Sequence, residues 1–181
     1  MDALEIQERL DEVRVRLLEA LSPLPDEALT QPGAVGEWSV ADVLAHFVNW
    51  EAELVTGFNQ IDGGRTPGRL LEALQDREAY NATRYEDIKG RDLDRIFDDL
   101  QGVRVQLEEW LEEFSTSDLQ EPGRVRGAKK MPLWRIIAAA SFEHEADHLQ
   151  DIEAYAERWL GRADRTIDIN DIEVSRNGNS N

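Results

Sequence analysis

The chain has 181 residues, about the length of one domain, and 41% of them are hydrophobic, enough for a buried core. Its 38 acidic and 20 basic residues give a net charge of −18, which disfavours nucleic acid and anionic membrane surfaces as partners. Cysteine is absent, which excludes disulfides and thiolate ligands, and no leader-like or membrane-spanning apolar run occurs, so we expect a cytoplasmic protein.

Apolar residues recur at helical spacing through most of the chain. The first predicted helix covers residues 4–21 and ends before Pro23. The second begins at Ser39, because Asp42 three residues later completes a capping box, and it is expected to end near Gly57.

The second half of the chain predicts three further helices. One covers residues 70–87 and is stopped by Gly90, and the next covers residues 93–114. The last long helix covers residues 132–160, and Gly161 is its expected end.

The C-terminal tail differs from the rest of the sequence. Residues 166–174 alternate apolar and polar side chains, as a short strand does, and residues 175–181 are polar and expected to be frayed. We therefore divide the chain into a helical domain over residues 1–161 and a tail over residues 162–181. An edge strand, an arm onto a partner subunit and disorder all remain open for this tail.

A weak internal repeat links the two halves of the helical domain. Residues 21–33 and 111–123 each run from a helix end, past a leucine, into a Pro-Gly pair. A tryptophan, Trp38 or Trp134, then precedes a long helix that carries histidine. Two such halves packed with approximate two-fold symmetry predict a four-helix bundle.

The chain contains three histidines, and all of them lie on predicted core faces. His144 and His148 are four residues apart, which places both imidazoles on one side of a helix and lets them reach one ion. His46 lies between apolar residues of the second predicted helix in the same way. The stripe of the last helix comprises Ile136, Ile137, Ala140, His144, His148, Ile152 and Tyr155.

Two interpretations of these histidines remain open. In the first, each histidine is an ordinary core or surface residue. In the second, the three imidazoles bind one divalent ion and leave coordination positions for water or substrate. Such a site suits Zn²⁺, Ni²⁺ or Fe²⁺. Asp151 shares the face of His144 and His148, and we select it as a fourth ligand or as the acceptor that orients an imidazole. Among the other acids of this helix Asp147 lies on the flank, and an ordinary solvated face is expected for Glu143, Glu145 and Glu153.

Around these residues the sequence resembles the DinB-like superfamily of metal-dependent enzymes. The resemblance rests on the stretch from Trp38 to His46, which reads WSVADVLAH, on Trp50-Glu51, and on the stretch from Phe142 to His148, which reads FEHEADH. It covers roughly residues 3–160. It implies an all-α, up-down-down-up four-helix bundle, often a homodimer, in which His46, His144 and His148 hold one metal.

The resemblance also implies a reaction class. Related branches transfer low-molecular-weight thiols, isomerise maleylpyruvate or detoxify a cyclopropane-bearing genotoxin. We therefore expect a metal-dependent S-transferase or hydrolase that acts on a small electrophilic molecule, with an external thiol because the chain has no cysteine. The alternative is a helical bundle that binds a metal or a small ligand without catalysis.

Further roles around the site follow from this hypothesis. Asp151 is our candidate for a general base. Trp50 and Trp134 line the pocket or simply pack in the core. The chain has one basic cluster, which consists of Arg124, Arg126, Lys129 and Lys130. Two interpretations of it remain open: it binds a carboxylate of the thiol or substrate, or it is an ordinary solvated loop.

Overall fold

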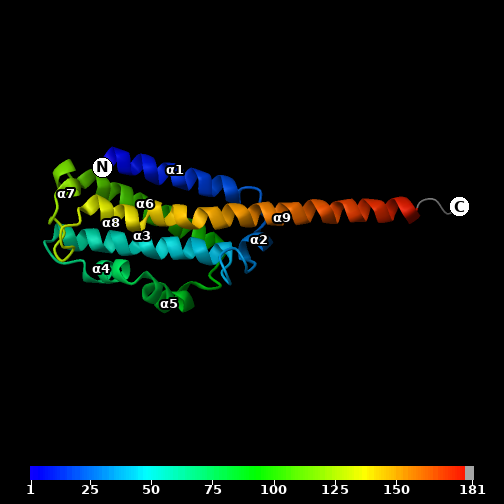
Figure 1. The fold of residues 1–181 in the computed structure, drawn as a ribbon, viewed down its shortest axis with the longest axis horizontal. Coiled ribbons are helices and arrows are strands. Elements are labelled where there is room, and N and C mark those ends of the chain that lie inside the picture. The colour runs from blue at the N-terminus through cyan, green and yellow to red at the C-terminus, as the bar shows by residue number, and fades with distance from the viewer. Residues whose placement is uncertain (178–181) are drawn as a thin grey trace.

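The computed structural model describes the backbone of residues 1–177 and the side chains of residues 1–162. In this part of the chain the regular elements are helices, in agreement with the all-α class predicted from the apolar spacing (Figure 1). In chain order they are α1 (Ala3–Leu21), α2 (Asp26–Thr30), α3 (Val40–Asp62), α4 (Gly68–Gln75), α5 (Arg77–Ile88), α6 (Leu93–Glu113), α7 (Thr116–Gln120), α8 (Leu133–Ala140) and α9 (Phe142–Asn177). Among the described residues, no helix combines the length and apolar character needed to cross a membrane.

The long helices α1, α3, α6 and α8–α9 lie side by side and enclose the core (Figure 1). Arg14 and Arg16 of α1 pair with Glu145 and Glu153 of α9, so the numbering rises in the same direction along both helices. Between α3 and α6 the residue numbers of contacting pairs also increase together, so these two helices run in the same direction. Between α1 and α6 they change in opposite senses, so these two helices are antiparallel. The bundle therefore has two helices in each direction, and α4 and α5 lie outside it against α3.

Helix α3 begins where the capping box predicted. The Ser39 hydroxyl accepts a hydrogen bond from the backbone N–H of Asp42, and the Asp42 carboxylate accepts one from the N–H of Ser39. The predicted end near Gly57 is wrong, because α3 continues to Asp62. At Gly57 a Cβ atom would lie 2.7 Å from Leu70 Cδ2, so glycine is needed there for the close approach of α4 rather than for a helix end.

The single helix predicted over residues 70–87 is two helices, α4 and α5. Asp76 separates them with an extended φ of −138° and ψ of 80°. Its side chain accepts a hydrogen bond from the N–H of Ala79 and so caps α5. Apolar periodicity alone did not predict this break, because both helices bury apolar residues against the same bundle.

The two Pro-Gly connections of the internal repeat have similar local structure. Each contains a helix of five residues, α2 in the first and α7 in the second, which the sequence analysis did not predict. Leu29 in α2 and Leu119 in α7 are buried, so the leucine of each repeat packs into the core.

The last long helix differs from its prediction at three points. It is interrupted at Ser141, it passes Gly161 without stopping, and it remains helical to residue 177. The strand-like tail predicted over residues 166–174 is therefore wrong. A helix satisfies its backbone hydrogen bonds internally, whereas a lone strand in an all-helical chain has no partner for them. Residues 178–181 lie outside the described part, and an arm onto a partner subunit stays a prediction.

Four charges, one from each long helix, meet inside the bundle, and we call them the ion network: the buried Glu51, Arg104 and Glu145 and the partly buried Arg14. Arg14 Nε lies 2.9 Å from Glu145 Oε1, and Arg104 Nη2 lies 3.0 Å from Glu145 Oε2. Arg104 also donates to Glu51. The expectation that Glu145 is solvated is wrong, because it is only 2% exposed and faces α1 and α6.

Candidate metal centre

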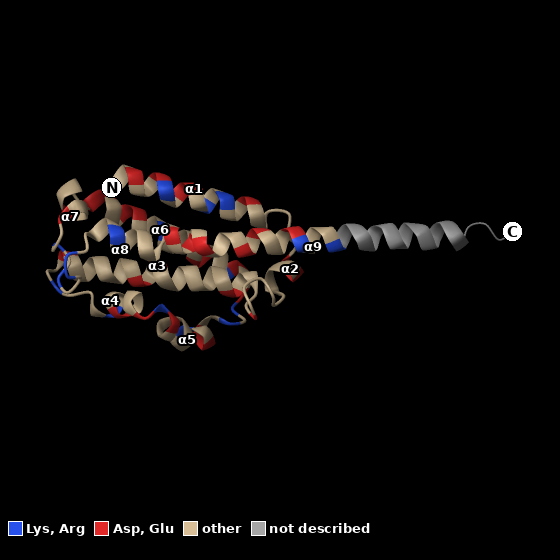
Figure 2. Ribbon diagram, in the orientation of Figure 1, with Lys and Arg blue, Asp and Glu red and all other residues tan. Residues whose placement is uncertain are grey.

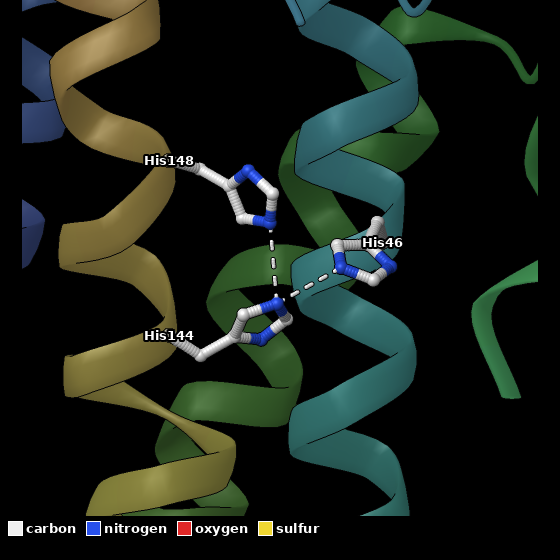
Figure 3. Close-up of side chains that lie close together, drawn as sticks. All are labelled: His46, His144 and His148. Atoms are coloured by element: carbon white, nitrogen blue, oxygen red, sulfur yellow. Dashed lines mark hydrogen bonds between the residues drawn. The ribbon is translucent and has the colours of Figure 1, made fainter. Parts of the chain in front are cut away.

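The three histidines of the chain converge from α3 and α9 (Figure 3). His144 Nε2 lies 3.1 Å from His46 Nε2 and 3.2 Å from His148 Nε2. Available ligand atoms of all three side chains lie within 4.8 Å of one another. The structure thus brings together the three residues selected from the sequence, although His46 and His144 lie 98 positions apart in the chain.

The capped start of α3 sets the position of His46. The side chain lies two turns after the N-cap residue Ser39, and the Trp38 ring packs edge-on against the imidazole at 5.2 Å. Trp38 is held in turn by paired backbone hydrogen bonds with Val35. His46 is 1% exposed, so the imidazole is fixed in the core rather than on a mobile surface.

The interruption at Ser141 sets the direction of His144 and His148. Ser141 has φ −132° and ψ −103°, which ends α8, and α9 begins one residue later. The Ser141 hydroxyl donates to the Ile137 carbonyl at 2.7 Å, and its own carbonyl accepts from the Glu145 N–H at 2.8 Å. Because His144 lies in the first turn of α9, this junction determines which way both imidazoles face.

All three imidazoles are held in the uncharged form. Burial, with a smaller contribution from the neighbouring His148, lowers the pKa of His46 to about 3. Burial also lowers the pKa of His144 to about 2, helped by the two other histidines and by Arg77. The pKa of His148 is lowered by burial as well, against the opposing charges of Asp151 and Asp147. Neutral imidazoles have the free lone pair that a metal ligand needs.

The spacing of the nitrogens around His144 Nε2 fits a divalent transition metal. Nitrogens that each lie ~2.1 Å from one zinc ion are ~3.0–3.4 Å apart in tetrahedral or octahedral geometry. The two separations from His144 Nε2, 3.1 Å and 3.2 Å, fall in this range, and ligand atoms of all three histidines lie within 4.8 Å of one another. One Nε2 lone pair cannot accept hydrogen bonds from two neighbouring imidazoles at once, so this group of three nitrogens fits a metal ion better than a set of hydrogen bonds.

Helix α5 and Trp50 form the wall beside His144. The Trp50 ring packs edge-on against the imidazole at 5.2 Å, and its indole N–H donates to Asn81 of α5 at 3.1 Å. The Arg77 guanidinium lies 5.8 Å from the centre of the Trp50 ring. Sequence reasoning missed Arg77, whose only local signal is its place at the start of a capped helix.

The two tryptophans proposed as pocket residues differ. Trp50 lies beside the histidines, whereas Trp134 is partly buried at the edge of the core under the Arg135 guanidinium. Trp38 and Tyr85, which stack on one another at 5.2 Å, complete the aromatic surroundings of His46.

The acids of α9 divide into three kinds. Asp147 and Asp151 are exposed and act on His148 through their charge, without a hydrogen bond to it. Glu143 and Glu153 pair with exposed arginines on the outside, as expected for a solvated face. Glu145 alone turns into the ion network. The group of close ligand atoms comprises the histidines without Asp151, and the role of Asp151 stays a prediction.

The basic cluster does not reach the histidines. Its four side chains are exposed in the connection before α8, at the end of the bundle where Figure 2 shows basic residues gathered. Helix α8 has 8 residues, so it separates this loop from the start of α9 by ~12 Å. Arg124 is paired there with Asp118.

Comparisons with known proteins agree with this structure. The model of the DinB superfamily matches residues 9–152, which include all three histidines. No curated protein matches the chain. A crystal structure of an uncharacterised protein from Escherichia coli UTI89 is similar, with a TM-score of 0.71 and 17% identity over 87% of this chain and 94% of the other. That likeness concerns the fold alone. Because the family model covers most of its length, the chain belongs to the DinB superfamily.

Proposed function

We propose that this protein is a metal-dependent enzyme that activates a nucleophile for attack on a small electrophilic molecule. The observation that carries the proposal is the convergence of three uncharged imidazoles, two buried and one partly buried, with His144 Nε2 lying 3.1 Å from His46 Nε2 and 3.2 Å from His148 Nε2. Structural zinc sites usually have four protein ligands, whereas three ligands leave a position for water or substrate. Among the described residues, no carboxylate joins this group as a fourth ligand.

His46, His144 and His148 would hold the ion. A divalent ion with an open position lowers the pKa of bound water or stabilises a bound thiolate. Trp38 and Trp50 cover the imidazoles of His46 and His144 with aromatic rings and keep solvent from that side. We keep Asp151 as the candidate base because its charge acts on His148 from the exposed side of α9.

The nucleophile would be an external low-molecular-weight thiol or water. The chain contains no cysteine, so it supplies no thiolate of its own. Zn²⁺, Ni²⁺ and Fe²⁺ all accept three imidazole ligands, and the donor set is equally suited to each.

A non-catalytic binding protein is the second candidate. His46 and His144 are 1% and 5% exposed, and such deep burial is also what sequestration of a metal requires. The two candidates differ in turnover and not in metal content.

The test combines metal content with thiol transfer. Elemental analysis of the purified protein should give close to one divalent ion per chain, and a metal-free protein with unchanged stability would overturn both candidates. With metal present, conjugation of a test electrophile to glutathione, bacillithiol or mycothiol should be lost in His144→Ala. The control is Gln150→Ala on an exposed position of α9, which should keep wild-type turnover. Absence of turnover with every thiol and every hydrolysable substrate would favour the binding protein.

We also propose that the protein is a cytoplasmic homodimer. Support for an interface comes from large apolar side chains exposed on neighbouring helices, Leu4, Val15 and Leu18 of α1 and Val105 of α6. Light scattering after size-exclusion chromatography should give twice the mass of one chain, and Leu18→Glu should lower the measured mass to that of one chain.

A further inference from the structure

Arg77 is a cation without an acidic partner beside the candidate metal centre. It is the first residue of α5, and its Nη2 donates to the Ala139 carbonyl at 2.6 Å, near the end of α8. Its guanidinium also lies over Trp50, the ring that packs on His144. No carboxylate among residues 1–162 forms an ion pair with it.

An unpaired arginine is notable in a chain of net charge −18. The other described arginines that reach the bundle interior, Arg14 and Arg104, are neutralised by Glu51 and Glu145. Arg77 is partly buried, and its charge is felt at the metal centre, because it helps to lower the pKa of His144 and of His148 after burial. A guanidinium has five N–H donors, and the Ala139 carbonyl accepts a hydrogen bond from one of them.

We propose that Arg77 binds the carboxylate of a substrate whose reacting end lies at the histidine centre. This inference rests on the proposed function, because it needs the metal as the second point of attachment. A planar guanidinium is suited to a carboxylate, which it binds with two parallel hydrogen bonds. The exposed Asp147 and Asp151 also act on His148 through their negative charge, which disfavours a carboxylate beside them, so we place the carboxylate at Arg77.

Arg77 also has a structural role that the test must separate from recognition. The interruption at Ser141 ends α8 nearby, and the hydrogen bond from Arg77 satisfies one carbonyl of its last turn. If this bond were what positions the metal site, its loss would weaken every ligand alike. Loss of the charge would weaken anionic ligands alone.

The experiment uses the full chain loaded with Co²⁺, whose visible spectrum reports each new ligand. Acetate is the anionic probe and imidazole is the neutral probe. We compare wild type with Arg77→Met, which removes the charge at similar length, and with Arg84→Met as matched control. Arg84 lies on the same helix over Tyr80 and pairs with Asp87.

We expect Arg77→Met to bind acetate about tenfold more weakly and imidazole as wild type does. Arg84→Met should bind both probes as wild type does. Unchanged acetate affinity in Arg77→Met, or an equal loss for both probes, would overturn the proposal. If Arg77→Met does not fold, Arg77→Gln replaces it: loss of the charge should again weaken acetate and spare imidazole, and unchanged acetate affinity in the folded variant contradicts the proposal. Wild type that binds no Co²⁺ overturns the proposed function itself.

Two thiols then distinguish where the carboxylate resides. Mercaptoacetate and 2-mercaptoethanol differ in the carboxylate, and both give a sulfur-to-cobalt band when bound. A selective loss of mercaptoacetate in Arg77→Met assigns the carboxylate to the thiol. Equal binding of both thiols, together with the loss of acetate, assigns it to the electrophile.

Discussion

Two polar clusters inside this bundle, the candidate metal centre and the ion network, lie close together and are built in opposite ways. The metal centre collects three uncharged imidazoles from α3 and α9, whereas the ion network collects four charges, one from each long helix. The clusters share sequence neighbours: Trp50 packs on His144, while Glu51 and Glu145, one residue later in each helix, enter the ion network. Successive helical residues point ~100° apart, so one helix can serve both clusters.

The difference shows which cluster holds the fold and which is free for chemistry. Charges that compensate one another stabilise only the arrangement in which all are present, because a lone buried charge is costly. Neutral imidazoles impose a smaller cost, because no charge is left buried, so we expect the fold to persist when the histidine cluster holds no ion. We therefore expect the ion network to govern unfolding and the histidines to govern metal binding.

The largest effect should come from Arg104→Met. This change leaves Glu51 and Glu145 buried with Arg14 alone, and the free energy of unfolding should fall by about 3–5 kcal/mol in urea titrations. The control is Arg16→Met, which breaks the exposed pair with Glu153 and should cost less than about 1 kcal/mol. Equal costs for the two variants would mean that the ion network is no more important than a surface pair.

The metal-dependent part of stability should disappear in His144→Ala. Zinc at 100 times its dissociation constant should raise the free energy of unfolding of wild type by about 2.7 kcal/mol. His144→Ala removes the central nitrogen of the three and should gain almost nothing from the same zinc. Arg16→Met should keep the full gain. A gain of similar size in wild type and His144→Ala would place the zinc elsewhere.

The sequence predicted the convergence of the three histidines, but not the ion network, for a physical reason. Three histidines in 181 residues form a small set, and the four-residue spacing of His144 and His148 implies a shared face. Arg104 and Glu145 are two among 58 charged residues, with no spacing that links them along the chain. Which charges meet depends on how the helices pack, and that information lies in tertiary contacts alone.

The same distinction applies to the helix boundaries. The start of α3 was predictable because Ser39 and Asp42 form the cap from within four residues. The interruption at Ser141 and the continuation of α3 beyond Gly57 were not predictable from local sequence, since both depend on how the helices pack. Gly57 looked like a helix end because glycine is common there, but it is required by the approach of Leu70.

Two capping boxes built on serine allow a matched test of how the fold supports His46. Ser39 caps α3, and Ser115 caps the short α7 with the same pattern of hydrogen bonds. Each change to alanine removes one cap and should cost about 1 kcal/mol or less. Ser39→Ala should also lower zinc affinity, because His46 lies two turns beyond the cap, whereas Ser115→Ala should leave it unchanged. The same zinc affinity in both variants would show that core packing alone positions His46.

The smallest effect should come from Asp151→Asn, which tests how far the metal centre depends on charge. Asp151 is exposed and raises the pKa of His148 against the larger effect of burial, without a hydrogen bond to the ring. Exposed charge pairs contribute about 0.2–1 kcal/mol, so zinc affinity should fall by less than about fivefold in competition titrations. Asp147→Asn is the matched control, since Asp147 acts on the same imidazole and should give a similarly small change. A loss of a hundredfold confined to Asp151→Asn would mean that Asp151 coordinates the ion, and the metal centre would then resemble the ion network in needing a buried charge.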